Sequence, residues 1–220
     1  MIIIINILVI FINVFLLYRS FCLYKENPHL IKTFYFDNLK DYFIASVLVV
    51  LAIILSVFFY YLKMPKWLTF SWLKLIDQSS TNLILSSIFI TAKYTNSKIL
   101  IFLISSLIYT LLVFAMPYLV HQEELIFRDC TFDTKSRIIK SLKFGFSHMI
   151  VGVPVFVAII LSIYGYLFSI RYVKSFLKKF SADGKNFMGA CEFALNQSSS
   201  LHSKYNFIII SICFILLLFS

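Results

Sequence analysis

Acidic, imidazole and amide side chains occur in three short clusters within otherwise apolar stretches of this sequence. The clusters occupy residues 123–128, 144–148 and 202–206, and their candidate residues are Glu123, Glu124, Arg128, Phe144, His148, His202 and Asn206. Ionisable groups are costly in a membrane helix, and by default they mark function. A carboxylate or an imidazole can take a proton from water, and an amide can stabilise a developing oxyanion. The clusters are therefore candidates for a functional site.

Helical spacing relates the residues within each cluster. Glu124 and Arg128 are four positions apart, which suits an ion pair and turns Glu123 to a neighbouring face. His202 and Asn206 are one turn apart and point the same way. Each cluster also has a structural interpretation: a solvated helix end, a packing histidine or interhelical hydrogen bonds. No single cluster identifies a function.

The composition predicts a multi-pass integral membrane protein. Of 220 residues, 60% are hydrophobic and 14% are charged, whereas soluble domains contain about 25% charged residues. This balance excludes a water-soluble globular domain and an intrinsically disordered chain. The formal net charge of +10 favours contact with lipid headgroups rather than with nucleic acid.

The four cysteines predict neither a disulfide framework nor a thiolate zinc site. Cys22, Cys130, Cys191 and Cys213 include no Cys-x-x-Cys pair. We therefore expect all four to be small buried hydrophobic residues.

Uncharged runs of sufficient length predict the membrane helices. A bilayer core of about 30 Å needs roughly 20 residues of helix, and the runs 2–18, 43–62 and 99–120 meet this need best. Residues 67–92 are interrupted by polar side chains and predict either one tilted span or two short helices. A last span is expected from about residue 196 to residue 219.

A turn at residues 152–154 decides whether the three clusters can meet. Proline tends to break a helix or begin one, so Pro154 predicts one helix over about 136–150 and another over about 154–172. With this turn, the last helix begins on the side of Glu123 and carries His202 in its early turns. All three clusters can then line one cavity.

The predicted fold class is therefore all-α, a polytopic transmembrane helix bundle with about six to eight spanning or re-entrant helices. Residues 1–98 would form N-terminal transmembrane helices, and residues 99–220 would form the core that holds the clusters. Lys and Arg occur in every connection, so the positive-inside rule predicts no orientation.

The order of the motifs Glu-Glu-x-x-x-Arg, Phe-x-x-x-His and His-x-x-x-Asn resembles that of the CPBP family, the CAAX proteases and bacteriocin-processing enzymes also called Abi proteins. The resemblance covers about residues 99–219. It implies an intramembrane glutamic endopeptidase that requires no cofactor. Carried over, Glu123 is the general base with His148 beside it, while His202 and Asn206 stabilise the oxyanion. The supporting residues are Glu124, Arg128 and Phe144.

Three other functions are compatible with the same residues. A zinc-dependent membrane protease would bind the metal through Glu123, His148 and His202, because three N/O ligands and a water suit catalytic zinc. The sequence has no His-Glu-x-x-His signature for it. A non-catalytic scaffold or bacteriocin-immunity-type protein would use the basic segments 135–143 and 171–179 to bind headgroups or a partner. A transporter would use the Glu and His pair to relay protons.

The protease interpretation implies two kinds of partner. They are membrane lipid and a peptide or protein substrate, which can itself be membrane-associated. The sequence does not indicate whether that substrate is prenylated. No nucleic acid partner is expected.

Overall fold

The computed structural model describes residues 2–28, 30–62, 64–75, 97–182 and 186–219. These residues form helices joined by turns and contain no β-strand. The long helices are α1 (Ile2–Glu26), α2 (Lys40–Tyr61), α4 (Lys98–Arg128), α5 (Thr134–Ser147), α6 (Val155–Ala182) and α7 (Phe187–Leu218). The short helical turns are η1 (Lys32–Phe36), η2 (Trp72–Leu75) and η4 (His148–Val151). The all-helical fold class is confirmed for the described residues.

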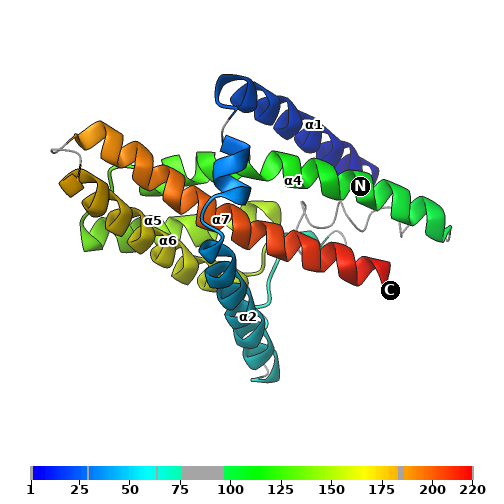
Figure 1. Ribbon diagram of the computed structural model, residues 1–220. Helices are drawn as coiled ribbons and strands as arrows, with labels where there is room; N and C mark the ends of the chain where they lie inside the picture. Colours follow the sequence, from blue (N-terminus) through cyan, green and yellow to red (C-terminus); the bar gives the residue numbers. More distant parts are fainter. Residues whose placement is uncertain (1, 29, 63, 76–96, 183–185, 220) are drawn as a thin grey trace.

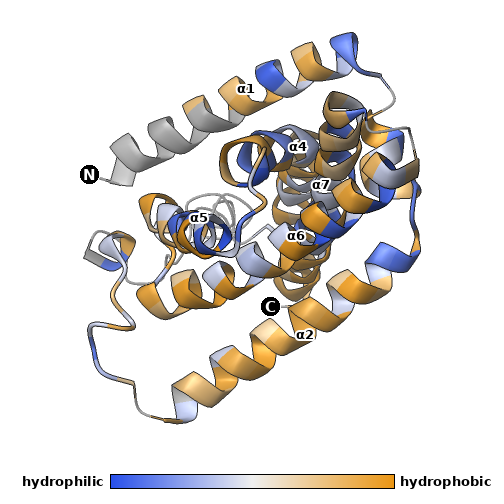
Figure 2. Ribbon diagram, turned by 90° about the vertical axis from the view of Figure 1, so that its left-hand side faces the viewer, coloured by the Kyte–Doolittle hydropathy of each residue, from blue (hydrophilic) through white to orange (hydrophobic). Residues whose placement is uncertain are grey.

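Among the residues that the structure describes, four helices are long and apolar enough to cross a membrane. They are Lys40–Phe59 within α2, Lys98–Arg128, Val155–Ala182 and Phe187–Leu218. Large apolar side chains point outward along α2, where Phe43 is 75% and Ile54 is 55% exposed. Figure 2 shows α2 as hydrophobic along most of its length. A helix surface of this kind suits lipid rather than water.

Two of the predicted spans, 2–18 and 67–92, are not among these four candidate spans. The count of six to eight membrane helices stays a prediction. The run 2–18 lies inside α1, which packs against α4 through Leu16, Ala115 and Tyr118. The segment 67–92 lies outside the described residues from position 76 onward, and its described part contains the short turn η2.

The helix α7 lies among α2, α4 and α6 and contacts all three (Figure 1). It begins at Phe187, earlier than the predicted start near residue 196. Asn186 caps this start, because its side chain accepts a hydrogen bond from the Gly189 N–H at 3.0 Å. The first turns pack against Tyr172 and Phe176 of α6. As a consequence, His202 lies in the middle of the helix rather than in its early turns.

The chain reverses at Gly152, close to the predicted turn. Gly152 has a φ of 90°, a left-handed conformation that glycine adopts without strain. Its N–H donates to the carbonyl oxygens of His148 and Met149, which tightens the end of the predicted 136–150 helix into η4. The next helix, α6, begins at Val155, directly after the proline.

The helix α5 is too short to cross a bilayer. Its 14 residues extend about 21 Å at 1.5 Å per residue, less than the core of about 30 Å. It packs closely on α6 at Gly145, where a Cβ would lie 2.1 Å from Oγ of Ser162 and 2.2 Å from the carbonyl oxygen of Ala158. Glycine at this position therefore permits the approach that places η4 beside α6.

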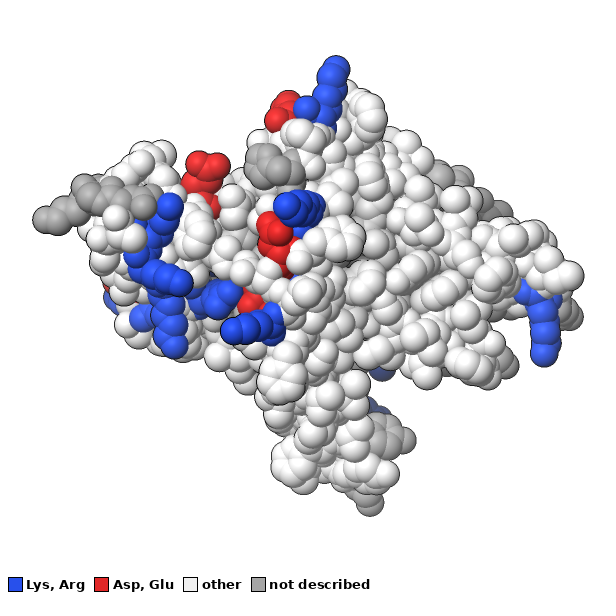
Figure 3. Space-filling model, in the orientation of Figure 1, with Lys and Arg blue, Asp and Glu red and all other residues white. Residues whose placement is uncertain are grey.

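Charged groups are unevenly distributed over the molecular surface. Figure 3 shows Lys and Arg gathered at the end of the molecule where α6 ends and α7 begins, while most of the remaining face is uncharged. One ion pair joins two helices near this end. Nη2 of Arg171 on α6 lies 3.0 Å from Oδ1 of Asp41 on α2, and it also donates to Gln197 on α7 at 3.3 Å.

The cysteines differ in their surroundings, and the expectation that all four are buried is wrong. Cys191 is buried, Cys22 and Cys213 are half-buried, and Cys130 is exposed. The exposure of Cys130 follows from its position in the turn between α4 and α5, where connecting segments run over the surface.

Candidate active site

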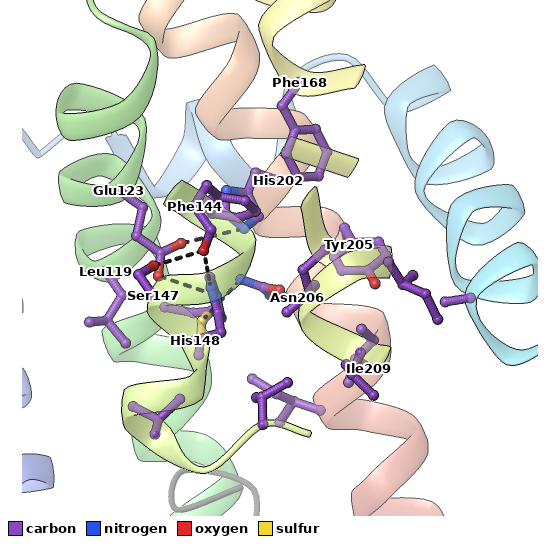
Figure 4. Close-up of a pocket in the computed structure, with 18 of the residues that line it drawn as sticks. Leu119, Glu123, Phe144, Ser147, His148, Phe168, His202, Tyr205, Asn206 and Ile209 are labelled. Carbon is purple, nitrogen blue, oxygen red and sulfur yellow. Dashed lines mark hydrogen bonds and ion pairs between the residues drawn. The ribbon is translucent and has the colours of Figure 1, made fainter. Parts of the chain in front are cut away.

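Three elements bring the candidate catalytic residues to one cavity of about 390 Å³ (Figure 4). The helix α4 contributes Glu123, the junction of α5 and η4 contributes Phe144 and His148, and α7 contributes His202 and Asn206. Residues from the three sequence clusters therefore line the same space, although 83 positions separate Glu123 from Asn206.

The Glu123 carboxylate lies between two imidazole rings. Its Oε1 is 3.7 Å from Nε2 of His148, and its Oε2 is 3.6 Å from Nε2 of His202. These separations exceed those of direct hydrogen bonds and suit contact through a small shared molecule such as water. The Glu123 side chain is 30% exposed, so its carboxylate can be reached from the cavity.

A backbone hydrogen bond orients His148. Its Nδ1 lies 2.8 Å from the carbonyl oxygen of Phe144. A carbonyl only accepts, so the proton is assigned to Nδ1, and Nε2 faces Glu123 with its lone pair. His148 lies outside the four candidate spans. Burial lowers its pKa below the ordinary value of 6.5, and the nearby charge of Arg128 lowers it further. A neutral imidazole with a free Nε2 can accept a proton.

Glu124 is fully buried and has partners for both carboxylate oxygens. Its Oε1 lies 2.9 Å from Nδ1 of His202, and its Oε2 accepts a hydrogen bond from the Ser198 hydroxyl and lies 3.5 Å from Nε of Arg128. The Arg128 guanidinium also lies over the Phe144 ring, 4.2 Å from its centroid. Through these contacts, Glu124 and Arg128 join α4 to both α5 and α7.

The His202 ring is held on two sides. It stacks on Phe168 of α6 with the ring centroids 4.6 Å apart, and its Nδ1 is bound by Glu124. Nε2 is consequently the atom that faces Glu123 and the cavity. This nitrogen donates a hydrogen bond when the ring carries both protons.

Asn206 faces the cavity one turn beyond His202, as the spacing on α7 predicts. Its Nδ2 lies 3.7 Å from Sδ of Met116 on α4. A thioether is a weak acceptor, so a stronger acceptor that enters the cavity would compete for the Asn206 N–H.

Two residues of the site were not among the sequence candidates. Ser198 stands four positions before His202 and eight before Asn206, so the same helical period could have identified it. Phe168 gives no such signal, because the sequence contains 25 Phe and the stacking depends on how α6 approaches α7.

Glu123, His148 and His202 are also the residues that could hold a metal ion in this cavity. Zinc binds N and O ligands at about 2.0–2.2 Å, so two ligands of one tetrahedral ion lie roughly 3.4 Å apart. The observed N–O separations of 3.6 and 3.7 Å are close to this value, but the two histidines face different oxygens of Glu123. Two N–O separations do not place three ligand atoms around one ion, and among the described residues Glu123, His148 and His202 do not form a group of converging ligand atoms.

No family model, curated protein or solved structure matches this chain. The resemblance to the CPBP family consequently rests on the three sequence motifs.

Proposed function

We propose that the chain is an intramembrane endopeptidase in which Glu123 activates a water molecule for attack on a peptide bond. The observation that most supports this is the Glu123 carboxylate within 3.7 Å of the Nε2 atoms of His148 and His202 in one cavity. Glu123 takes a proton from the attacking water, with the neutral His148 beside it as a second acceptor. The resulting hydroxide forms the tetrahedral intermediate.

His202 and Asn206 act on the charge that develops in this intermediate. Both side chains face the cavity from one side of α7, and each can donate a hydrogen bond to an oxyanion. Removal of one such donor typically costs about 2.7–4 kcal/mol of transition-state stabilisation. The proton then passes to the leaving amine, which completes hydrolysis without a cofactor.

The apolar wall of the cavity supports a hydrophobic peptide or protein substrate. This wall is formed by Ala52 of α2, by Val157, Ile160 and Leu161 of α6, and by Ile209 of α7. Such side chains suit the apolar part of a membrane-associated substrate. The proposed protein is embedded in lipid as a multi-pass bundle of six to eight membrane helices.

A comparison of membrane proteomes tests the proposal. Cells that carry the wild-type chain, Glu123→Gln or the exposed control Glu192→Gln are compared for new peptide termini by mass spectrometry. We expect the same termini with the wild type and Glu192→Gln, and their loss with Glu123→Gln, because an amide cannot act as the base. Equal sets of termini in all three would contradict the proposal.

Two alternatives predict different results. In the zinc-dependent protease, a strong chelator abolishes cleavage and added zinc restores it, because Glu123, His148 and His202 would hold the ion. In the scaffold or immunity-type protein, Glu123→Gln leaves the cellular phenotype intact, while charge reversal in the basic segments 135–143 and 171–179 abolishes it.

A further inference from the structure

A second group of reactive side chains lies where α4 ends and α7 begins, and none of its members lines the cavity described above. The ligand atoms of Asp129, Cys130 and Cys191 all lie within 4.8 Å of one another. Asp129 and Cys130 directly follow α4, and Cys191 belongs to the first turns of α7. Two thiols and a carboxylate that are about 60 positions apart in the sequence therefore lie close together in the structure.

The measured separation of two of these atoms suits a common zinc ion. Sγ of Cys130 lies 3.5 Å from Oδ1 of Asp129. A tetrahedral zinc with a sulfur at about 2.3 Å and an oxygen at about 2.0–2.2 Å places those two ligands roughly 3.5 Å apart. The third ligand atom, the sulfur of the buried Cys191, lies within 4.8 Å of the other two, so it would need to move by at most roughly 1.3 Å to reach the spacing of zinc ligands.

The backbone at Cys130 has an uncommon conformation that gives the turn its shape. Cys130 has a φ of 52°, in the left-handed region that few residues other than glycine occupy. Its N–H donates to the Tyr172 hydroxyl at 3.3 Å, and Tyr172 is fully buried. Strained backbone of this kind concentrates at functional positions.

Neighbouring side chains supply a hydrogen-bond donor and a positive charge that would stabilise a metal bound to Asp129, Cys130 and Cys191. The Tyr172 hydroxyl lies near the Cys191 thiol, so it can support a thiolate as an outer-shell donor. Two thiolates and one carboxylate carry three negative charges against the two positive charges of zinc. The ammonium group of Lys140, which donates to the carbonyl oxygen of Asp129 at 3.2 Å, opposes the remaining negative charge.

We propose that Asp129, Cys130 and Cys191 bind one zinc ion, with solvent at the fourth position. Zinc fits better than magnesium or calcium, because thiolates favour softer ions and carboxylates alone suit the harder ones. The ion would join the end of α4 to the start of α7. Since Glu123 and Glu124 lie near that end of α4 and His202 lies on α7, the ion would also restrain the candidate active site.

Metal analysis of the full chain tests this site. The protein is purified in detergent with a reductant, dialysed, and measured for bound zinc; cobalt(II) is then substituted and the absorption spectrum is recorded. We expect about one zinc per chain and a thiolate-to-cobalt charge-transfer band. Both should be lost in Cys130→Ser and in Cys191→Ser, and both should persist in the matched controls Cys22→Ser and Cys213→Ser.

Several results would overturn the site. They are a wild-type chain without bound zinc, zinc that persists when Cys130 and Cys191 are both replaced, or a cobalt spectrum without thiolate bands. A disulfide between Cys130 and Cys191 in protein purified under reducing conditions would also overturn it. The cobalt spectrum of the wild-type protein shows whether thiolates bind the metal even if the variants fail to fold.

The measurement is independent of peptide cleavage, so its failure and the failure of the proposed protease are distinguishable. It also separates two sources of zinc dependence. A chelator effect on cleavage that persists in Cys130→Ser belongs to the cavity of Glu123 rather than to the site at Cys130.

Discussion

Glu123 and Glu124 are neighbours in the sequence but have different surroundings. Glu124 is fully buried and binds Ser198, Arg128 and His202, whereas Glu123 is partly exposed and faces two imidazole nitrogens across gaps of 3.6 and 3.7 Å. A residue whose hydrogen-bonding capacity is already used stabilises structure, and a residue open to a cavity is available for chemistry. We therefore expect replacement by glutamine to lower stability at Glu124 and to lower activity at Glu123.

The first prediction concerns Glu124→Gln. The change removes the carboxylate nearest to Arg128, whose guanidinium nitrogens have no hydrogen-bond partner among the described residues. Breaking a buried pair of this kind typically costs about 3–5 kcal/mol. We expect a clear fall in the thermal unfolding midpoint of the detergent-solubilised protein, while Glu123→Gln leaves that midpoint nearly unchanged. Equal midpoints for the two variants would contradict the assigned roles.

The second prediction concerns His148 and pH. Its pKa is lowered by burial, so the folded state binds a proton less readily than the unfolded state. Above pH about 6.5 the ring is neutral in both states, and stability is lost as the pH falls below that value. The wild type should therefore lose more thermal stability between pH about 7.5 and about 5.5 than His148→Gln does. An equal loss in both proteins would exclude His148 as the group that titrates.

The third prediction concerns His202 and Asn206. In Asn206→Ala the oxyanion loses one donor, so cleavage should fall by roughly 10²–10³-fold with little change in substrate binding. His202→Gln should lower cleavage further, because the ring also contacts Glu124 and Phe168. Rates are compared for any substrate identified from the membrane proteome. A variant at Asn206 with wild-type activity would remove that side chain from the mechanism.

At the scale of elements, the site depends on how closely α5 approaches α6. Gly145 allows this approach, and the short turn η4 then carries His148 back toward α4. Because α5 does not cross the bilayer, its register against α6 is set by side-chain contact rather than by hydrophobic length. Small changes in this contact should therefore displace His148.

The fourth prediction tests that contact. In Gly145→Val the new Cβ would lie about 2 Å from atoms of Ser162 and Ala158, and overpacking of this kind typically costs about 1–3 kcal/mol. We expect lower thermal stability and lower cleavage together. Phe146→Ala is the control, because Phe146 is the next residue of α5 and is 43% exposed. Unchanged behaviour of Gly145→Val would show that α5 tolerates displacement.

Local sequence signals predicted some elements and failed for others. Gly152 and Pro154 carry their own conformational preferences, so the turn between α5 and α6 was predictable. The start of α7 was placed too late, because its first turns are held by Ala190, Cys191, Ala194 and Leu195, which are buried in a cluster with Tyr172 and Phe176 of α6, contacts that no local pattern reveals. The same limit applies to Phe168 beside His202.

At the scale of the whole molecule, the apolar composition corresponds to many large apolar side chains exposed on the surface. In the best-fitting window of each candidate span, only 17–44% of the residues are buried inside the structure, so more than half of each window is at least partly exposed at the surface. Composition predicted a membrane protein, and the lengths of the uncharged runs predicted its helices. Neither could predict which polar residues meet, because Ser198, His202 and Lys204 are buried by partners far away in the sequence.

The fifth prediction concerns the outward face of α2. Val50 lies near the middle of the candidate span and is 53% exposed. A lysine at the centre of a membrane helix costs about 2.5–3.5 kcal/mol on insertion scales. Val50→Lys should therefore reduce the amount of protein recovered in the membrane fraction, while Val50→Leu should not. Equal recovery would argue against lipid contact at this face.

The most direct test of the central claim follows oxygen from water into the product. Wild-type protein and Glu123→Gln are each incubated with membranes in heavy-oxygen water, and the C-termini of the released peptides are examined by mass spectrometry. The wild type should place one labelled oxygen in each new carboxylate, and Glu123→Gln should produce no labelled termini. Equally labelled termini from both proteins would contradict water activation by Glu123.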